Sequence, residues 1–255
     1  MRLVIWIIAA ALCVALTALA FFPASWLTYE VEKESGGRLT LGDAQGTLWR
    51  GSAFIGGAPG KGDPVTPLLP GRFSWKLSPL LLLGQVDAEL ENPAALSQTV
   101  KVSGSWSQWQ VSGATVELPA DRLGGLGAPL NTIQPSGQMQ LSWGPLLLAR
   151  HGTAMAVTGN TNLELSDIGS RLSNIRPLGA YHVGIQWNGE QAHLELKTTR
   201  GPMLLNGEGN LVNGQFHFSG TAEAEAGQEQ KLANLLNLLG QRQRIGDKDV
   251  FALRL

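Results

Sequence analysis

The stretch YHVGIQW, residues 181–187, is the longest alternating run of the chain. Its apolar members are Tyr181, Val183, Ile185 and Trp187. They fall on one side of an extended chain, because successive side chains of a strand point to opposite faces. Strict alternation of this kind is typical of an antiparallel strand with one buried and one wet face. Residues 181–187 therefore predict a sheet with one apolar side.

The same period of two recurs through most of the chain. The dipeptides Asn188-Gly189, Asn206-Gly207 and Asn213-Gly214 are typical of tight hairpins and separate several of the runs. We therefore expect a mainly β fold, a curved antiparallel sheet that is either an open groove or a partly closed barrel or sandwich. The further runs are Phe73, Trp75 and Leu77; Val86, Ala88 and Leu90; Ala114, Val116 and Leu118; Met139, Leu141 and Trp143; Leu163 and Leu165; Ala192, Leu194 and Leu196; and Phe216 and Phe218.

Two segments match each other at a constant offset of 66 residues. The motif Gly-x-Phe-x-Trp-x-Leu-x-Pro-Leu-Leu-Leu begins at Gly71, and Gly-x-Met-x-Leu-x-Trp-x-Pro-Leu-Leu-Leu begins at Gly137. A third copy opens at Gly179, where chance similarity between Gly- and Leu-rich strands explains the match equally well. One repeated β unit cannot bury its apolar face alone, so the copies are expected to share a core. We expect units near 71–130, 137–178 and 179–222.

Glycines bracket a tryptophan ahead of the first repeat. Gly46, Trp49 and Gly51 form this structural motif, and we interpret residues 46–53 as a strand whose backbone is bent or closely approached. Core packing is the favoured role of Trp49. Residues 56–71 are rich in glycine and proline and are expected to form a loop.

The N-terminal segment 3–22 is apolar or nearly so and carries no charge. A helix of that length spans about 30 Å, the thickness of a bilayer core. Ala18-Leu19-Ala20 also fits the cleavage site of a signal peptide, so cleavage stays an alternative. Trp26 and Tyr29 follow the span as interfacial aromatics and favour an uncleaved anchor. Arg2 before the span places residues 1–2 in the cytoplasm and residues 23–255 outside it.

Helical signals flank the expected sheet at both ends. Residues 29–34 are expected to extend the anchor helix until Gly36-Gly37 ends it. Near the C-terminus, Leu232, Leu235, Leu236 and Leu239 follow helical spacing, so a short helix is expected over 228–240. This helix either packs on the sheet or docks a partner. Residues 250–255 are expected to close the sheet as a final strand.

The residues of the chain indicate no catalytic chemistry. The net charge is −1, with no basic stripe for nucleic acid, and the single cysteine, Cys13, lies inside the apolar segment. The four histidines lack the spacing of a helical metal site, and no nucleophile elbow occurs. Gly60-Lys61 lacks the first glycine and the hydroxyl residue of a phosphate loop. We therefore expect a protein that is not an enzyme and needs no cofactor or metal.

The chain resembles the type II secretion system protein N family over essentially its full length. The motifs that carry the resemblance are GTLWRGSA at 46–53, FSWKLSP at 73–79, PLGAY at 177–181 and GQFHFSGTA at 214–222, after the single N-terminal span. The resemblance implies a bacterial inner-membrane protein with a periplasmic domain, an accessory part of the general secretion pathway that contacts other secretion subunits. A looser likeness, over short segments only, is to AsmA-like envelope proteins, whose curved sheets form apolar grooves.

The expected functional surface is therefore an apolar sheet face rather than a set of reactive side chains. In the favoured interpretation the protein acts by contact with secretion subunits. In the alternative the face is an open groove that binds or handles lipid, and in the simplest case the same residues close a dry core. The candidate residues are Phe73, Trp75, Leu77, Met139, Leu141, Trp143, Tyr181, Val183, Ile185 and Trp187.

Overall fold

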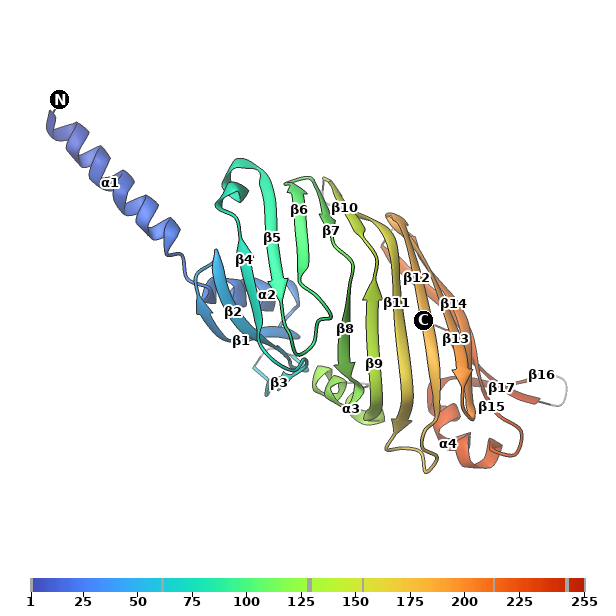
Figure 1. Ribbon diagram of the computed structural model, residues 1–255. Coiled ribbons are helices and arrows are strands. Elements are labelled where there is room, and N and C mark those ends of the chain that lie inside the picture. Colours follow the sequence, from blue (N-terminus) through green and yellow to red (C-terminus); the bar gives the residue numbers. More distant parts are fainter. Residues whose placement is uncertain are drawn as a thin grey trace.

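The structure is a computed structural model that describes residues 2–60, 62–127, 130–152, 154–212, 214–245 and 248–254. It is mainly β, with one large open antiparallel sheet that does not close on itself. Figure 1 shows that the N-terminal helix projects from one end of the sheet. Successive strands lie farther and farther from this helix. The expected antiparallel sheet, N-terminal apolar helix and short C-terminal helix are confirmed, and of the two expected forms the sheet takes the open one.

The described elements comprise four α-helices, two 3₁₀ helices and seventeen strands. The α-helices are α1 (Arg2–Ala20), α2 (Ser25–Glu34), α3 (Leu130–Ile133) and α4 (Glu229–Leu239), and the 3₁₀ helices are η1 (Pro79–Leu83) and η2 (Ala120–Leu126). The strands are β1 (Leu39–Gly46), β2 (Arg50–Gly57), β3 (Thr66–Pro67), β4 (Phe73–Leu77), β5 (Gln85–Glu91), β6 (Val100–Ser105), β7 (Gln108–Val111), β8 (Ala114–Pro119), β9 (Pro135–Trp143), β10 (Leu146–His151), β11 (Ala154–Ser170), β12 (Gly179–Gly189), β13 (Gln191–Arg200), β14 (Met203–Val212), β15 (Gln215–Ala224), β16 (Gln241–Ile245) and β17 (Lys248–Arg254).

Strand pairing makes a continuous path through the described part of the sheet. The path runs β1, β2, β4, β5, β6, β7, β10, β11, β12, β13, β14, β15, β17, β16, and every pairing in it is antiparallel. The long strand β11 pairs with β10 along its first part and with β9 along its second. β9 in turn pairs with β8, so two short ladders lie end to end against one long strand.

The register places all ten candidate residues on one side of the sheet. Directly paired residues share a face, and the pairs Trp75–Leu90, Leu90–Val100, Val111–Leu146 and Leu148–Val157 carry that face from β4 to β11. From β11 it continues through Leu163, which pairs with both Leu141 and Val183. We call this side the apolar face and the other side the polar face.

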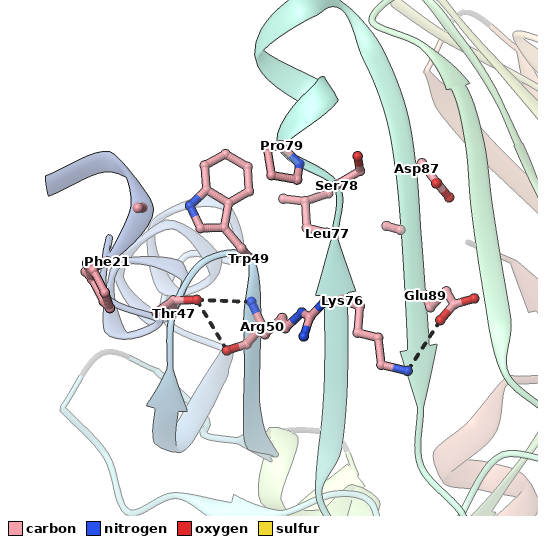
Figure 2. A pocket seen from close by; sticks show the side chains of 12 residues that line it. Phe21, Thr47, Trp49, Arg50, Lys76, Leu77, Ser78, Pro79, Asp87 and Glu89 are labelled. Carbon is pink, nitrogen blue, oxygen red and sulfur yellow. Dashed lines mark hydrogen bonds and ion pairs between the residues drawn. The ribbon is translucent and has the colours of Figure 1, made fainter. Parts of the chain in front are cut away.

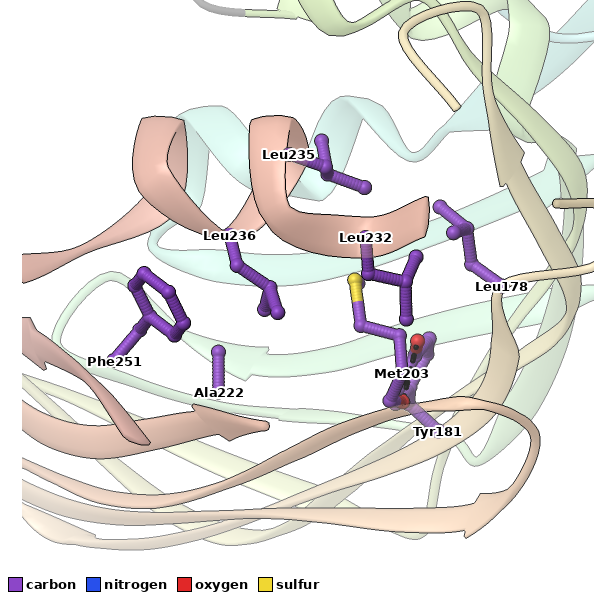
Figure 3. Packing of buried hydrophobic residues seen from close by; sticks show 8 residues of the cluster. All are labelled: Leu178, Tyr181, Met203, Ala222, Leu232, Leu235, Leu236 and Phe251. Carbon is purple, nitrogen blue, oxygen red and sulfur yellow. Dashed lines mark hydrogen bonds between the residues drawn. The ribbon is translucent and has the colours of Figure 1, made fainter. Parts of the chain in front are cut away.

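Helix α4 builds the main hydrophobic core by covering one end of the apolar face. Its leucines Leu232, Leu235 and Leu236 pack on Tyr181, Met203, Ala222, Phe251 and Leu178 from four strands and a loop, as Figure 3 shows. Because the apolar stripe of α4 is used in this core, the structure favours the sheet-packing role of the helix over docking.

Several local expectations were wrong. Residues 29–34 belong to a separate helix, α2, because Pro23 lacks an amide hydrogen and interrupts the helix after Ala20. Residues 47–49 form a turn between β1 and β2 instead of a strand. Residues 56–71 are not all loop, since β2 extends to Gly57 and Thr66–Pro67 form β3.

The hairpin signals had mixed outcomes. Asn206-Gly207 lies inside β14, where glycine is needed because a Cβ at Gly207 would lie 2.6 Å from Phe218 Cζ. The β12–β13 hairpin is present but its two linking residues are Gly189 and Glu190, one position later than expected. At the third site Val212 pairs with Gln215, while Asn213 lies outside the described residues. Lys61 of the Gly60-Lys61 pair also lies outside the described residues.

The C-terminal end adds a strand that the sequence did not indicate. The segment after Gly240, which contains Arg242 and Arg244, forms β16 and pairs with β17. β17 contains the expected final strand over 250–254, and Leu255 lies outside the described residues.

Candidate functional site

The apolar face is buried in places and half-exposed elsewhere. Tyr181 at the start of β12 is 2% exposed beneath α4, and Phe73 is 5% exposed. The eight other candidate residues have intermediate exposure: Trp75, Leu77, Met139, Leu141, Trp143, Val183, Ile185 and Trp187. Burial therefore falls along β12 from Tyr181, which α4 covers, to Trp187 at the far end of the strand.

The tryptophans of the apolar face direct their polar atoms into the protein. The Trp75 indole nitrogen donates to the Leu48 carbonyl at 3.0 Å, and that of Trp143 donates to the Ser112 carbonyl at 3.0 Å. The Trp187 indole nitrogen donates to Thr161 Oγ1 at 3.1 Å. Since each N–H is satisfied within the sheet, the exposed parts of these rings are hydrocarbon.

Charged side chains of the sheet pair on the polar face. Lys76 lies 3.5 Å from carboxylate oxygens of both Glu89 and Glu91, and Lys101 lies 3.6 Å from Glu89. Further along, Lys197 pairs with Glu195 at 2.5 Å, and the resulting hydrogen bond lowers the pKa of the Glu195 carboxyl. The two faces of one sheet therefore differ sharply in polarity.

Helix α1 is joined to the first strands by direct hydrogen bonds. The Leu48 amide donates to the Phe22 carbonyl at 2.7 Å, and the Ala24 amide donates to the Gly46 carbonyl at 3.1 Å. The Trp49 indole nitrogen donates to the Leu19 carbonyl at 2.7 Å. The segment from Gly46 to Trp49 is therefore bonded once to α1 itself and twice to the residues that connect α1 to α2.

A hollow of about 590 Å³ lies at this junction (Figure 2). Its lining is mixed, with Phe21, Trp49 and Pro79 beside the charged residues Arg50, Lys76, Asp87 and Glu89. Figure 2 shows the charged side chains on the β2, β4 and β5 side and Phe21 at the end of α1. The charged residues Arg50, Lys76 and Glu89 of this hollow belong to the polar face of the sheet.

The motif Gly46-x-x-Trp49-x-Gly51 shapes this turn. Gly46 has φ +87°, and a Cβ there would lie 2.4 Å from the Arg50 carbonyl oxygen. A Cβ at Gly51 would lie 2.4 Å from Trp75 Cζ2. Trp49 itself is 9% exposed against α1. Both glycines thus allow close approach, and the tryptophan links the sheet to α1.

The free edge of β1 is covered by the hydroxyl groups of Thr28 in α2 and of Ser35 directly after α2. No sequence pattern indicated this contact. β1 pairs only with β2 among the described strands. The Leu39 amide donates to Ser35 Oγ at 3.0 Å, and the same hydroxyl lies 3.1 Å from the Leu39 carbonyl oxygen. Thr28 Oγ1 donates to the Leu41 carbonyl at 3.2 Å. Covering an edge in this way prevents a further strand from adding there.

Reactive chemistry is sparse in the described residues. No group of three or more histidine, cysteine, aspartate or glutamate side chains in them is placed to hold a metal ion. The buried Tyr181 hydroxyl donates to the Met203 carbonyl at 3.0 Å, and burial raises the pKa of Tyr181 well above its usual range. Its hydroxyl therefore stays protonated and has a packing role.

Helix α1 is the one described helix long and apolar enough to cross a membrane. Its residues 3–20 have a mean hydropathy of 2.7, and none of them is buried against the rest of the chain. An exposed apolar surface of this size on a helix is typical of a segment surrounded by lipid.

Comparison with known proteins gives one family match. The model of the family described as type II secretion system protein N matches residues 37–249. No curated protein and no solved structure matches the chain.

Proposed function

Because the chain belongs to the type II secretion system protein N family, we propose that it is an inner-membrane accessory component of that secretion machinery. Helix α1 spans the membrane with its N-terminus in the cytoplasm, and the sheet lies in the periplasm. The function is contact with neighbouring secretion subunits, and it includes no catalytic step.

The hydrogen-bonded junction between α1 and the sheet is the observation that carries this proposal. A flexible tether would let the sheet rotate freely, whereas the bonds at Phe22, Ala24 and Trp49 hold it in one orientation to the anchor. Membrane anchoring raises the effective concentration of the sheet near other membrane subunits, and a fixed orientation presents the same surface to each of them.

Two polar surfaces of the described sheet are available for partner contact. The β1 edge is covered by Ser35 and Thr28, and the apolar stripe of α4 lies in the core. The polar face and the β16 edge are exposed, and their paired charges suit a polar, reversible interface. We therefore place the contacts with secretion subunits on the polar face and at β16.

Site-specific photocrosslinking in cells tests the proposed function. A photoreactive amino acid replaces Gln186 on the polar face or Gln243 in β16, two exposed positions. We expect adducts with inner-membrane secretion subunits that disappear in a strain lacking the secretion genes. Recovery of no such adduct from either position, with the variants present in membranes at normal levels, contradicts the contact role.

A further inference from the structure

The half-exposed part of the apolar face is a continuous strip. It includes Leu90 on β5, Leu141 on β9, Leu163 on β11, Val183 on β12 and Leu194 on β13, all of intermediate exposure. Large contiguous apolar surfaces are rare on soluble proteins and mark sites of interaction. We therefore expect an apolar ligand or partner to cover this strip.

The length of the strip exceeds that of an ordinary ligand pocket. From β4, which holds Trp75, to β13, which holds Leu194, the sheet path passes through eight successive strands, and strands are spaced about 4.8 Å apart, so the strip measures about 34 Å. One leaflet of a bilayer has a hydrocarbon depth of about 15 Å, half the thickness of the core. The strip is therefore longer than the hydrocarbon depth of one leaflet.

The strip begins next to the membrane anchor. Trp49, directly before β2, donates its indole hydrogen to Leu19 of α1, and its carbonyl accepts from the amide of the apolar-face residue Leu77 at 2.7 Å. Figure 1 shows that the strands then lead away from α1 towards β17. With α1 in a bilayer, apolar surface therefore continues from the hydrocarbon region onto the sheet.

The chemistry of the strip selects hydrocarbon over polypeptide. A peptide laid on a sheet face needs partners for its backbone amides, and a buried unpaired amide is costly. Here the indole hydrogens of Trp75, Trp143 and Trp187 are already donated within the sheet, and the charged residues Lys197, Glu195 and Glu164 lie on the opposite face. An acyl chain has no polar group to satisfy, so it fits this surface without that cost.

We propose that the apolar face binds the acyl chains of phospholipid drawn from the membrane in which α1 is anchored. The bound chains lie along the strip from the β2–β4 end towards α4, with headgroups towards solvent. α4 closes the far end, because its leucines fill the apolar face over Tyr181 and Ala222. This inference rests on the proposed membrane anchoring but not on any secretion partner.

Photolabelling with lipid tests this proposal on the full chain. The protein is reconstituted in nanodiscs of phosphatidylethanolamine and phosphatidylglycerol that contain a phospholipid with a diazirine at the end of one acyl chain. After illumination, labelled peptides are mapped by mass spectrometry. We expect label on α1, which reports anchoring, and also on β9 and β12, which reports occupancy of the strip.

A matched pair of leucines makes the test specific to the face. Leu141 lies on the apolar face, whereas Leu147 on β10 is 45% exposed on the polar face. Leu141→Glu should reduce the β9 and β12 label by about tenfold or more, because a carboxylate in contact with hydrocarbon is costly. Leu147→Glu should leave the label unchanged, and circular dichroism verifies that both variants retain the sheet.

The outcomes separate this proposal from the proposed function. Label on α1 with none on β9 or β12 overturns lipid binding and leaves the anchoring intact. Label on β9 and β12 that Leu141→Glu does not reduce also overturns it, since the lipid then lies elsewhere. Absence of label on α1 contradicts the anchoring itself. If Leu141→Glu loses the sheet, Leu141→Gln replaces it, with the same expected loss and the same contradicting result.

Discussion

Single residues at the β1–β2 turn determine how the sheet meets the anchor. Gly51 accommodates the Trp75 ring, and Gly46 takes a left-handed conformation that allows the turn. The sequence identified Gly46, Trp49 and Gly51 as a structural motif, but it could not show the partners. The close neighbours of Gly51, the Trp75 ring and Gln45 carbonyl, come from other strands, and such contacts depend on pairing that no local pattern encodes.

Substitution of Gly51 tests this close approach. Gly51→Ala should destabilise the sheet by about 1–3 kcal/mol, the usual cost of forcing atoms into a packed site, because its Cβ would lie 2.4 Å from Trp75 Cζ2. Gly144→Ala is the control, since no atom lies within 4 Å of a Cβ placed there. Urea unfolding followed by tryptophan fluorescence measures both. Equal midpoints for the two variants contradict the packing role of Gly51.

Asp43 and Arg72 provide a pH-dependent contact on the polar face. Arg72 donates to Asp43 Oδ2 at 2.6 Å and stacks 4.6 Å from the centre of the Phe54 ring. The Arg72 hydrogen bond holds the pKa of the Asp43 carboxyl below its ordinary value of 3.8. A lowered pKa in the folded state stabilises the fold above the ordinary pKa, and this contribution is lost as the pH falls through the lowered value.

The corresponding prediction is a difference in acid sensitivity. Asp43 has φ +49°, a conformation that asparagine tolerates, so Asp43→Asn removes the charge and keeps the backbone. The melting temperature of the wild type should exceed that of the variant at pH 6, and the gap should narrow below about pH 4. A gap that stays constant from pH 6 to pH 3 contradicts the role of the ion pair.

At the scale of elements, alternation predicted most strands, because a strand with one buried face leaves a local pattern. The runs at 73–77, 86–90, 139–143 and 181–187 all lie in strands. Their order in the sheet was not predictable, since β7 pairs with β10 and β11 pairs with three strands, β9, β10 and β12. The role of Gly207 was misassigned because a glycine needed for packing looks the same as one needed for a turn.

The two segments that match at an offset of 66 residues form β4 and β9, but the structure after them differs. The leucines at 80–83 belong to η1, whereas those at 146–148 belong to β10. A 3₁₀ turn follows Ser78, whose hydroxyl accepts from the Leu80 amide at 3.3 Å and caps it. The internal repeat remains our proposal for how a chain of this length extends one sheet.

Helix α4 should contribute strongly to stability through its buried stripe. Leu232→Ala should cost about 2–5 kcal/mol, because Leu232 is fully buried against the apolar face. Leu238→Ala removes a side chain that is 57% exposed and should change stability by less than about 0.5 kcal/mol. Chemical unfolding compares the two. Similar losses for both variants contradict the packing of α4 seen in Figure 3.

At the scale of the whole molecule, the protein combines an apolar helix with a sheet whose two faces differ. The bonds at Leu19, Phe22 and Ala24 join the sheet to α1 and to the residues that follow it, and the strands lead away from α1. The order of apolar and polar residues could predict the apolar helix and the one-sided sheet, but the direction of the strands relative to α1 required the pairing order.

Cysteine labelling in spheroplasts tests the central claim, an anchor with the sheet on the periplasmic side. Cys13→Ser removes the single native thiol, and Gln186→Cys adds one at an exposed position of the polar face. A membrane-impermeant maleimide added to intact spheroplasts should label this variant as fully as it does after lysis. Labelling only after the inner membrane is broken would place the sheet in the cytoplasm and contradict the claim.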